Sequence, residues 1–223
     1  MVEHTFHKRK VAGPNPAADT QYMLTEERIH RLKTVASNRI QDIIVLENIH
    51  DPHNAAAALR NCDSFGIQEV HIIFETEKIF NPEKLGKLTS ASANKWLTIK
   101  TWKTTSECFS ELKKRGYTIY ATAIDLKAAS FDALELPETP CAFVFGNEGF
   151  GITETVKKLA DVLLYIPMYG FVDSLNLSVT VGVVAHALSL KRRTSKQSLY
   201  SSSQASDLAG KWTARDEERR KVV

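Results

Sequence analysis

The sequence has few cysteines and lacks any long apolar run. Its three cysteines, Cys62, Cys108 and Cys141, stand far apart, without the spacing of metal ligands and without the even number that a disulfide framework needs. Reduced thiols in a cytoplasm are the simplest interpretation. No stretch is long enough to span a bilayer, and no apolar segment follows the basic N-terminus as in a secretory signal. We expect a cytoplasmic protein with no membrane partner.

A glycine-rich turn after the first expected strand is also missing. That strand, residues 42–49, runs into Asp51-Pro52-His53-Asn54, whereas a dinucleotide fingerprint needs glycines there so that a pyrophosphate can rest on the helix N-terminus. The glycines of GNEGFG, residues 146–151, follow a late strand, and no P-loop lysine comes after them. These absences disfavour a nicotinamide-dependent oxidoreductase and a nucleoside triphosphatase.

Charge is unevenly distributed along the chain. The net charge of +3 divides into +3 for residues 1–40, −5 for residues 41–190 and +5 for residues 191–223. Basic ends beside an acidic middle suggest that the ends bind a polyanion. Basic tails that merely aid solubility are the alternative, and charge alone leaves both open.

The order of expected elements predicts the fold class. Apolar runs predict strands at 42–49, 70–74, 95–102, 117–124, 140–148 and 161–168. Helices are expected between them, capped by Thr25 and Asp51 and ended by Gly66 and Gly116. Strand–helix alternation predicts an α/β fold with an open, mainly parallel sheet and helices on both faces. We expect a basic extension with one helix at 1–40, the main domain at 41–193, and a second basic extension at 194–223 that starts with a Ser-rich linker.

Unusual residues follow four of the expected strands, in 47–54, 121–125, 146–151 and 166–178. Ligands of open α/β sheets bind beyond the carboxyl ends of the strands. Glu148 is therefore a candidate site residue, although an exposed loop carboxylate is its simpler interpretation. Ser174 and Asn176 could cap the last helix or, since they alternate with leucines, could lie in an extended stretch that offers polar groups to a ligand.

Residues 53–66, HNAAAALRNCDSFG, combine small side chains with one arginine. Asn54 lies in the first turn of the expected helix, and Arg60 lies seven positions after His53 on nearly the same face. The alanines could pack against the sheet or a partner helix while Arg60 points to water. Alternatively, Arg60 acts on a substrate. Both interpretations hold if the alanines pack against a helix of a second subunit.

Together these segments resemble the TrmH (SpoU) family of the SPOUT superfamily, RNA ribose 2′-O-methyltransferases that use S-adenosyl-L-methionine. The resemblance covers about residues 25–215 and rests on three motifs in order: ENIHDPHNAAAALRNCDSFG, FVFGNEGFGIT and IPMYGFVDSLNLSVTVGV. It implies a deep trefoil knot in the C-terminal part of the sheet and a homodimer. The methyl donor would sit in the knot, against Thr122, Gly146, Ile166 and Leu175.

The resemblance also implies catalytic positions. Arg60 matches the catalytic arginine, and Asn54, Glu148, Ser174 and Asn176 match the other polar motif positions. A guanidinium has a pKa above about 12 and no acceptor lone pair, so it is a poor general base. We favour Arg60 holding a phosphate and stabilising charge that develops on the 2′-oxygen. A substrate phosphate, water or Glu148 would then take the proton.

The substrate implied by the resemblance is tRNA or rRNA. Many rRNA members carry an RNA-binding domain before the first motif, and about 40 residues are too few for one. One short helix in front and a basic tail behind resemble members that methylate a D-loop guanosine of tRNA. The lysine-free loop GNEGFG keeps an rRNA substrate open. A non-catalytic RNA-binding relative would lack a motif residue, and none is missing.

Overall fold

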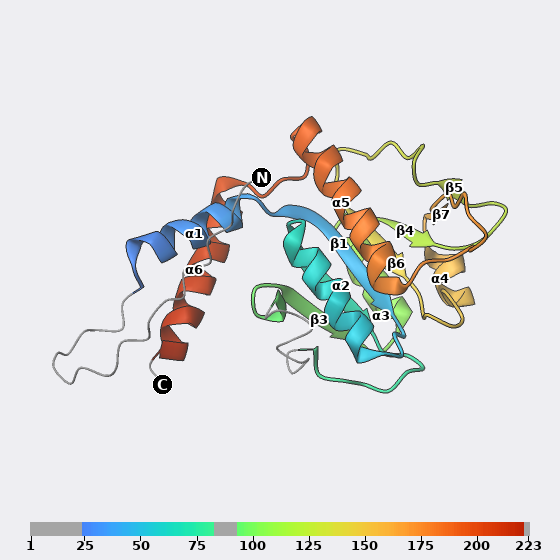
Figure 1. Ribbon diagram of the computed structural model, residues 1–223, viewed down its shortest axis with the longest axis horizontal. Coiled ribbons are helices and arrows are strands. Elements are labelled where there is room, and N and C mark those ends of the chain that lie inside the picture. The colour runs from blue at the N-terminus through green and yellow to red at the C-terminus, as the bar shows by residue number, and fades with distance from the viewer. Residues whose placement is uncertain (1–23, 83–92, 221–223) are drawn as a thin grey trace, which may run out of the picture.

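The computed structural model describes residues 24–82 and 93–220. Its centre is a seven-stranded sheet with every strand parallel, in the order β3-β2-β1-β6-β4-β7-β5 (Figure 1). The strands are β1 Ile40–Glu47, β2 Ile67–Ile73, β3 Thr98–Trp102, β4 Thr118–Thr122, β5 Ala129–Ser130, β6 Cys141–Phe145 and β7 Val162–Tyr165. The helices are α1 Glu26–Ser37, α2 Pro52–Ser64, α3 Thr105–Lys114, α4 Glu154–Leu159, α5 Leu177–Ser195 and α6 Ser202–Arg220, with a short 3-10 turn η2 at Ala93–Lys95. The predicted parallel α/β sheet is confirmed.

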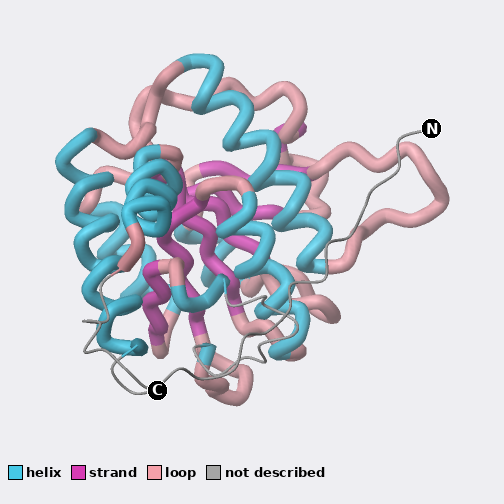
Figure 2. Tube along the Cα trace, turned by 60° about the vertical axis from the view of Figure 1, so that its left-hand side comes forward, coloured by secondary structure: helices cyan, strands magenta, loops and turns pink. Residues whose placement is uncertain are grey.

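Helices cover both faces of the sheet (Figure 2). On the face of α2 and α5, one core includes Ile44 and Leu46 of β1; on the face of α3 and α4, a second core includes Ile43 and Val45. Successive side chains of a strand point to opposite faces, so a strand between two helix layers must be apolar throughout. This explains why the strands appear in the sequence as continuous apolar runs.

The predicted helix boundaries agree with the observed caps. The Thr25 side chain accepts a hydrogen bond from the Arg28 amide, and the Asp51 carboxylate accepts one from the His53 amide. Gly66 follows the C-cap of α2 with a φ of +84°, a conformation that favours glycine. Strand boundaries differ more: β1 and β2 begin two and three residues earlier than predicted, and the two-residue strand β5 was not predicted.

The two ends of the described chain form one helical unit. In Figure 1, α1 and α6 lie side by side, away from the sheet, and they share a small core that includes Leu32, Leu208 and Trp212. The Trp212 indole donates to the Trp96 carbonyl at 3.0 Å, which fixes this unit to the rest of the protein. Helix α6 begins at Ser202, inside the predicted Ser-rich linker, because burial of its apolar side overrides the low helix propensity of serine.

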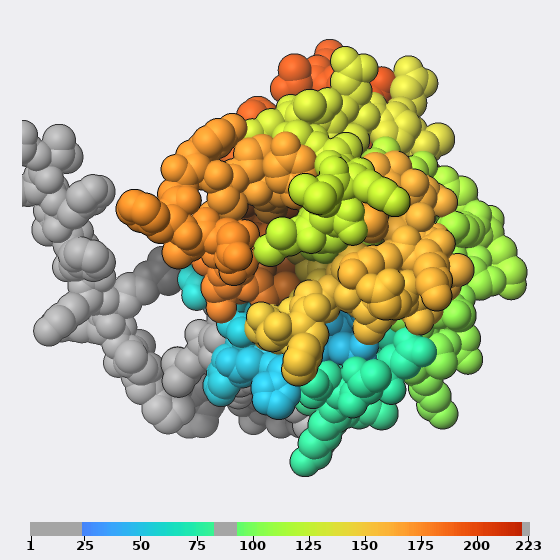
Figure 3. Space-filling model, turned by 90° about the vertical axis from the view of Figure 1, so that its right-hand side faces the viewer, coloured from blue at the N-terminus to red at the C-terminus, as the bar shows by residue number. Residues whose placement is uncertain are grey.

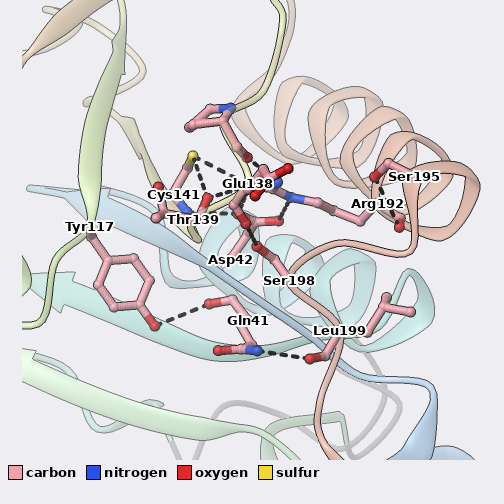
Figure 4. Close-up of polar contacts among 11 residues, drawn as sticks. Gln41, Asp42, Tyr117, Glu138, Thr139, Cys141, Arg192, Ser195, Ser198 and Leu199 are labelled. Atoms are coloured by element: carbon pink, nitrogen blue, oxygen red, sulfur yellow. Dashed lines mark hydrogen bonds and ion pairs between the residues drawn. The ribbon is translucent and has the colours of Figure 1, made fainter.

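A buried ion pair ties the end of α5 to the start of the sheet (Figure 4). The Arg192 guanidinium contacts both Asp42 oxygens at 2.8 Å, and both side chains have zero exposure. Arg192 also donates to the carbonyls of Pro137 and Thr139, and Asp42 accepts the Cys141 amide at 2.7 Å. These bonds satisfy the charges away from water, as a buried pair requires.

The strands β1, β6, β4 and β7 are adjacent, so the segments after them meet at one edge of the sheet. The predicted convergence of four carboxyl ends is therefore confirmed. Within residues 24–82 and 93–220, no helix combines the length and apolarity that crossing a membrane requires.

Candidate active site

A cavity of about 470 Å³ opens at the carboxyl ends of β4, β6 and β7. Figure 3 shows it as a hollow bordered by the loops after these strands, coloured lime, yellow and orange. All four predicted cofactor residues line it: Thr122, Gly146, Ile166 and Leu175. Glu148 and Ser174, predicted as catalytic, line it too. Its volume lies within the range of small-molecule pockets, which is about 300–1,000 Å³.

Gly146 allows the chain to close tightly beside this cavity. A Cβ at Gly146 would lie 2.2 Å from the backbone carbon of Gly151. The amides and carbonyls of Asn147 and Gly151 bond to each other in both directions at 2.9 Å, so the loop closes on itself. Glycine is needed at position 146 because the backbone approaches so closely that no side chain fits.

Asn147 and Asn48 hold this loop, and neither was singled out from the sequence. The Asn147 side chain accepts the Gly149 amide at 2.8 Å and donates to the Asn48 carbonyl at 2.7 Å. Asn48 has a φ of +50° and accepts the amides of Glu75 and Thr76. The sequence signal that could have identified Asn48 is an asparagine directly after a buried strand, because asparagine tolerates the left-handed region of backbone conformation.

Glu47, at the end of β1, fixes the other side of the loop. Its carboxylate accepts the Thr153 amide at 3.0 Å and the Thr153 hydroxyl at 2.6 Å, and it lies 3.3 Å from the Thr105 hydroxyl. Burial raises the pKa of Glu47, although the bonds from Thr153 and Thr105 oppose this. Because Thr153 caps α4, Glu47 anchors the start of that helix to the central strand.

The three motifs meet at the mouth of the cavity. The Asn54 amide donates to Glu148 Oε1 at 3.0 Å, and the Asn176 amide donates to Asn54 Oδ1 at 3.0 Å. The other Glu148 oxygen accepts the His50 backbone amide at 3.2 Å. His50, Asn54, Glu148 and Asn176, which come from three separate segments of the chain, therefore form one hydrogen-bonded network.

Asn176 is the N-cap of α5. Its Oδ1 accepts the Ser178 amide at 2.9 Å and the Ser178 hydroxyl at 2.7 Å. Asn176 therefore caps the last helix and also takes part in the network at the cavity mouth. The extended stretch ends at Asn176, so Ser178 lies in the helix, whereas Ser174 remains in an exposed loop.

Arg60 lies apart from this network within its own chain. It is exposed on α2 and does not line the cavity, and its side chain has no hydrogen bond or ion pair among the described residues. Ala55, Ala56 and Ala58 of the same helix are buried. The side-chain amide of Asn61 donates to the Ser178 backbone carbonyl at 2.6 Å, so α2 packs closely on α5. The alanines thus have the packing role, and Arg60 faces outward from the protomer.

Comparison with known proteins assigns the family. The sequence profile described as the SpoU rRNA Methylase family matches residues 41–186. The chain belongs to the SpoU family. It is 37% identical to a tRNA (guanosine(18)-2′-O)-methyltransferase of Thermus thermophilus over 179 residues, which cover 79% of this chain and 88% of that protein.

Solved structures agree with this SpoU assignment. The TrmH/SpoU tRNA modifying enzyme of Aquifex aeolicus superposes with a TM-score of 0.73 and 27% identity over 86% of this chain and 97% of that one. The SpoU methyltransferase AviRb of Streptomyces viridochromogenes, solved with the cofactor AdoMet, shares the fold at a TM-score of 0.61 and 17% identity, over 80% of this chain and 63% of that one.

Proposed function

We propose that this SpoU protein transfers a methyl group from S-adenosyl-L-methionine to the ribose 2′-hydroxyl of guanosine 18 in tRNA. The observation that carries the proposal is the network of Asn54, Glu148 and Asn176 at the mouth of the cavity. One residue from each motif comes to one place, beside a pocket of suitable size. The Thermus relative, which covers most of the chain, supports tRNA rather than rRNA.

The cavity suits the cofactor. Gly146, with its closely approaching backbone, and Leu175 and Ile166, with apolar side chains, would hold the adenosine part. Asp173 and Glu148 are the lining carboxylates available to a cationic amino-acid part. When bound, the cofactor supplies a methyl carbon on a positively charged sulfur. The proposal includes a C-terminal trefoil knot around this cavity.

The proposal includes a homodimer that uses the outer sides of α2 and α5. On α5, the side chains of Val179, Val183 and Leu190 are 48%, 43% and 59% exposed. Their spacing of four and seven places them on one side of the helix. A second copy that covers this apolar stripe would bring Arg60 of the partner subunit toward the network at the cavity mouth. That arrangement would explain why Arg60 has no partner of its own among the described residues.

Within such a site, the roles follow from chemistry. Arg60 would bind the phosphate beside the target ribose and stabilise negative charge on the 2′-oxygen, since guanidinium has five donors and no acceptor. Asn54 and Asn176 would orient Glu148 and the ribose. Ser174, exposed at the cavity wall, would contact the cofactor or the ribose.

The helical unit of α1 and α6 is the proposed tRNA-binding surface. Arg31 and Lys33 on α1 and Lys211 and Arg219 on α6 are exposed, and none is hydrogen-bonded or ion-paired to a described residue. Free cations on a rigid support suit phosphate contacts. In the proposed division, residues 41–193 carry out methyl transfer, and the two ends, 1–40 and 194–223, bind the RNA. The location would be the cytoplasm.

Methyl transfer from labelled cofactor to purified tRNA and rRNA, offered together, tests the proposal. We expect label in tRNA alone. Label in rRNA alone would favour the rRNA members of the family, and label in neither would overturn the proposal.

A further inference from the structure

His50 lies beside the network at the cavity mouth, although it does not line the cavity itself. Its backbone amide bonds to Glu148 in the site network, and its imidazole Nδ1 lies 3.1 Å from Glu77 Oε2. The side chain is nevertheless 78% exposed, and no described residue bonds to Nε2. The imidazole is thus fixed at one nitrogen and open at the other.

Glu77 is itself held in place. Its Oε1 lies 3.5 Å from the Asn147 amide, while Oε2 contacts His50. A carboxylate can only accept a hydrogen bond, so the proton of neutral His50 belongs on Nδ1. The lone pair then lies on Nε2, the nitrogen to which no described residue bonds. A carboxylate that orients a histidine in this way is the arrangement that makes imidazole an effective base.

The proposed reaction needs such a group. Methylation of a 2′-hydroxyl releases a proton, and Arg60 has no lone pair to accept it. Among the residues joined at the cavity mouth, the amides of Asn54 and Asn176 cannot accept a proton at neutral pH, and both Glu148 oxygens already accept hydrogen bonds.

We propose that His50, oriented by Glu77, accepts the proton of the ribose 2′-hydroxyl. The inference rests on the proposed function, since it names the proton acceptor of that reaction. As the 2′-oxygen forms its bond to the methyl carbon, its O–H bond breaks and the proton moves to His50 Nε2. The carbon–sulfur bond breaks with its electron pair left on sulfur, which loses its positive charge. Water then removes the proton from the imidazolium.

The charged groups around His50 set the pH at which it acts. The hydrogen bond that His50 donates to Glu77 is the largest influence and raises the pKa of His50, and the charges of Glu77, Glu148 and Asp51 raise it further. Partial loss of hydration opposes them and lowers the pKa slightly. A raised pKa means that the neutral, accepting form appears at higher pH. Activity should therefore rise with pH through the pKa of His50, and removing Glu77 should move this rise to lower pH.

The test combines kinetics with a measurement on the protein alone. The ring resonance of His50, assigned by its loss in His50→Ala, is titrated by NMR in the cofactor-free protein. Single-turnover methyl transfer to tRNA is measured over the same pH range. We expect the acid limb of the rate to share the midpoint of the titration, and Glu77→Gln to shift both to lower pH. Glu135→Gln, an exposed loop carboxylate without a hydrogen-bond or ion-pair partner among the described residues, should shift neither.

His50→Ala should lower the single-turnover rate by about 10²–10⁴-fold, abolish the acid limb and leave the affinities for tRNA and S-adenosylhomocysteine unchanged. Added imidazole should restore part of the rate. If wild type methylates tRNA and His50→Ala retains the rate or the acid limb, the role of His50 is overturned and the proposed function stands. If wild type does not methylate tRNA, both fail.

Discussion

The Asn54 amide nitrogen lies 3.0 Å from Glu148 Oε1, although 94 residues separate them in the chain. The same Asn54 side chain accepts the Asn176 amide through its oxygen. Asn54 therefore joins the first motif to both of the others. Correct placement of Glu148 and Asn176 depends on it.

Asn54→Ala should reduce methyl transfer by about 10²-fold, because loss of both hydrogen bonds misplaces the groups beside the substrate. Cofactor affinity should fall much less than the rate, since Asn54 does not itself line the cavity. Transfer assays and calorimetry with S-adenosylhomocysteine measure the two effects. Ser64→Ala, on the far end of the same helix, is the control. Loss of cofactor binding in Asn54→Ala would contradict this assignment.

Gly146→Ala should abolish cofactor binding and lower stability, because the added Cβ would meet the Gly151 backbone at 2.2 Å. Gly149→Ala is the matched control in the same loop: its Cβ would meet Asn147 Oδ1 at 3.4 Å, an ordinary contact. Calorimetric titration with S-adenosylhomocysteine compares the two variants. Equal affinities would mean that the loop can open without harm to the cavity.

Arg192→Leu should lower the free energy of unfolding by about 3–5 kcal/mol, because it leaves the Asp42 carboxylate buried without its cation. Arg219→Leu, on the exposed side of α6, should change it by less than about 0.5 kcal/mol. Urea denaturation measures both. If the two variants unfold alike, the ion pair does not stabilise the fold in this way.

The stability of the protein should fall with acid through Glu69 and His71. Burial raises the pKa of Glu69, but hydrogen bonds from His71, Arg115 and Lys100 outweigh it and hold the pKa well below its ordinary value of 4.5. Burial also lowers the pKa of His71. Each group protonates more readily when unfolded, so stability is present at neutral pH and is lost below 6.5 for His71 and below 4.5 for Glu69.

Urea denaturation at several pH values tests this linkage. Glu69→Gln should lower stability at neutral pH and reduce its loss below the ordinary pKa of glutamate, because the group whose ionisation favours the fold is gone. Parallel curves for the variant and wild type would show that other groups govern the acid response.

Charge reversal on α6 should weaken tRNA binding. Lys211→Glu and Arg219→Glu should each lower the steepness of the plot of log affinity against log salt concentration by about 1, which corresponds to the loss of one phosphate contact. Deletion of residues 194–223 is a poorer test, because it would expose the core that α6 shares with α1. Lys114→Glu, on α3, is the control, and equal weakening by all three changes would argue against a defined surface. Electrophoretic shift assays at several salt concentrations measure the effect.

Local signals in the sequence predicted local structure well. Thr25, Asp51 and Gly66 mark helix ends through contacts with their own neighbours, so their patterns carry the information. The start of helix α6 could not be placed in the same way, since serines that favour a linker become helical only where α1 covers their apolar neighbours. Asp42 and Arg192 are 150 residues apart, and no spacing relates them.

The candidate site also has residues that could be predicted from the sequence and residues that could not. The glycines and polar residues of the three motifs were predictable as a group, and the cavity gathers Gly146, Glu148 and Ser174 as expected. Asn48 and Asn147 were missed because they stabilise the loop after β6 through hydrogen bonds to backbone groups, and those groups come together only in the folded protein. The orientation of Arg60 was left open, because spacing alone does not show whether a helical arginine points to water, as it does here.

Mapping of the methylated nucleotide tests the central claim most directly. Unmodified tRNA would be incubated with the protein and the cofactor, and the modified ribose located at single-nucleotide resolution beside an Arg60→Ala variant. We predict 2′-O-methylation at guanosine 18 with wild type, and none with the variant, which should still bind S-adenosylhomocysteine. Methylation at another position or on a base, or normal methylation by Arg60→Ala, would contradict the account.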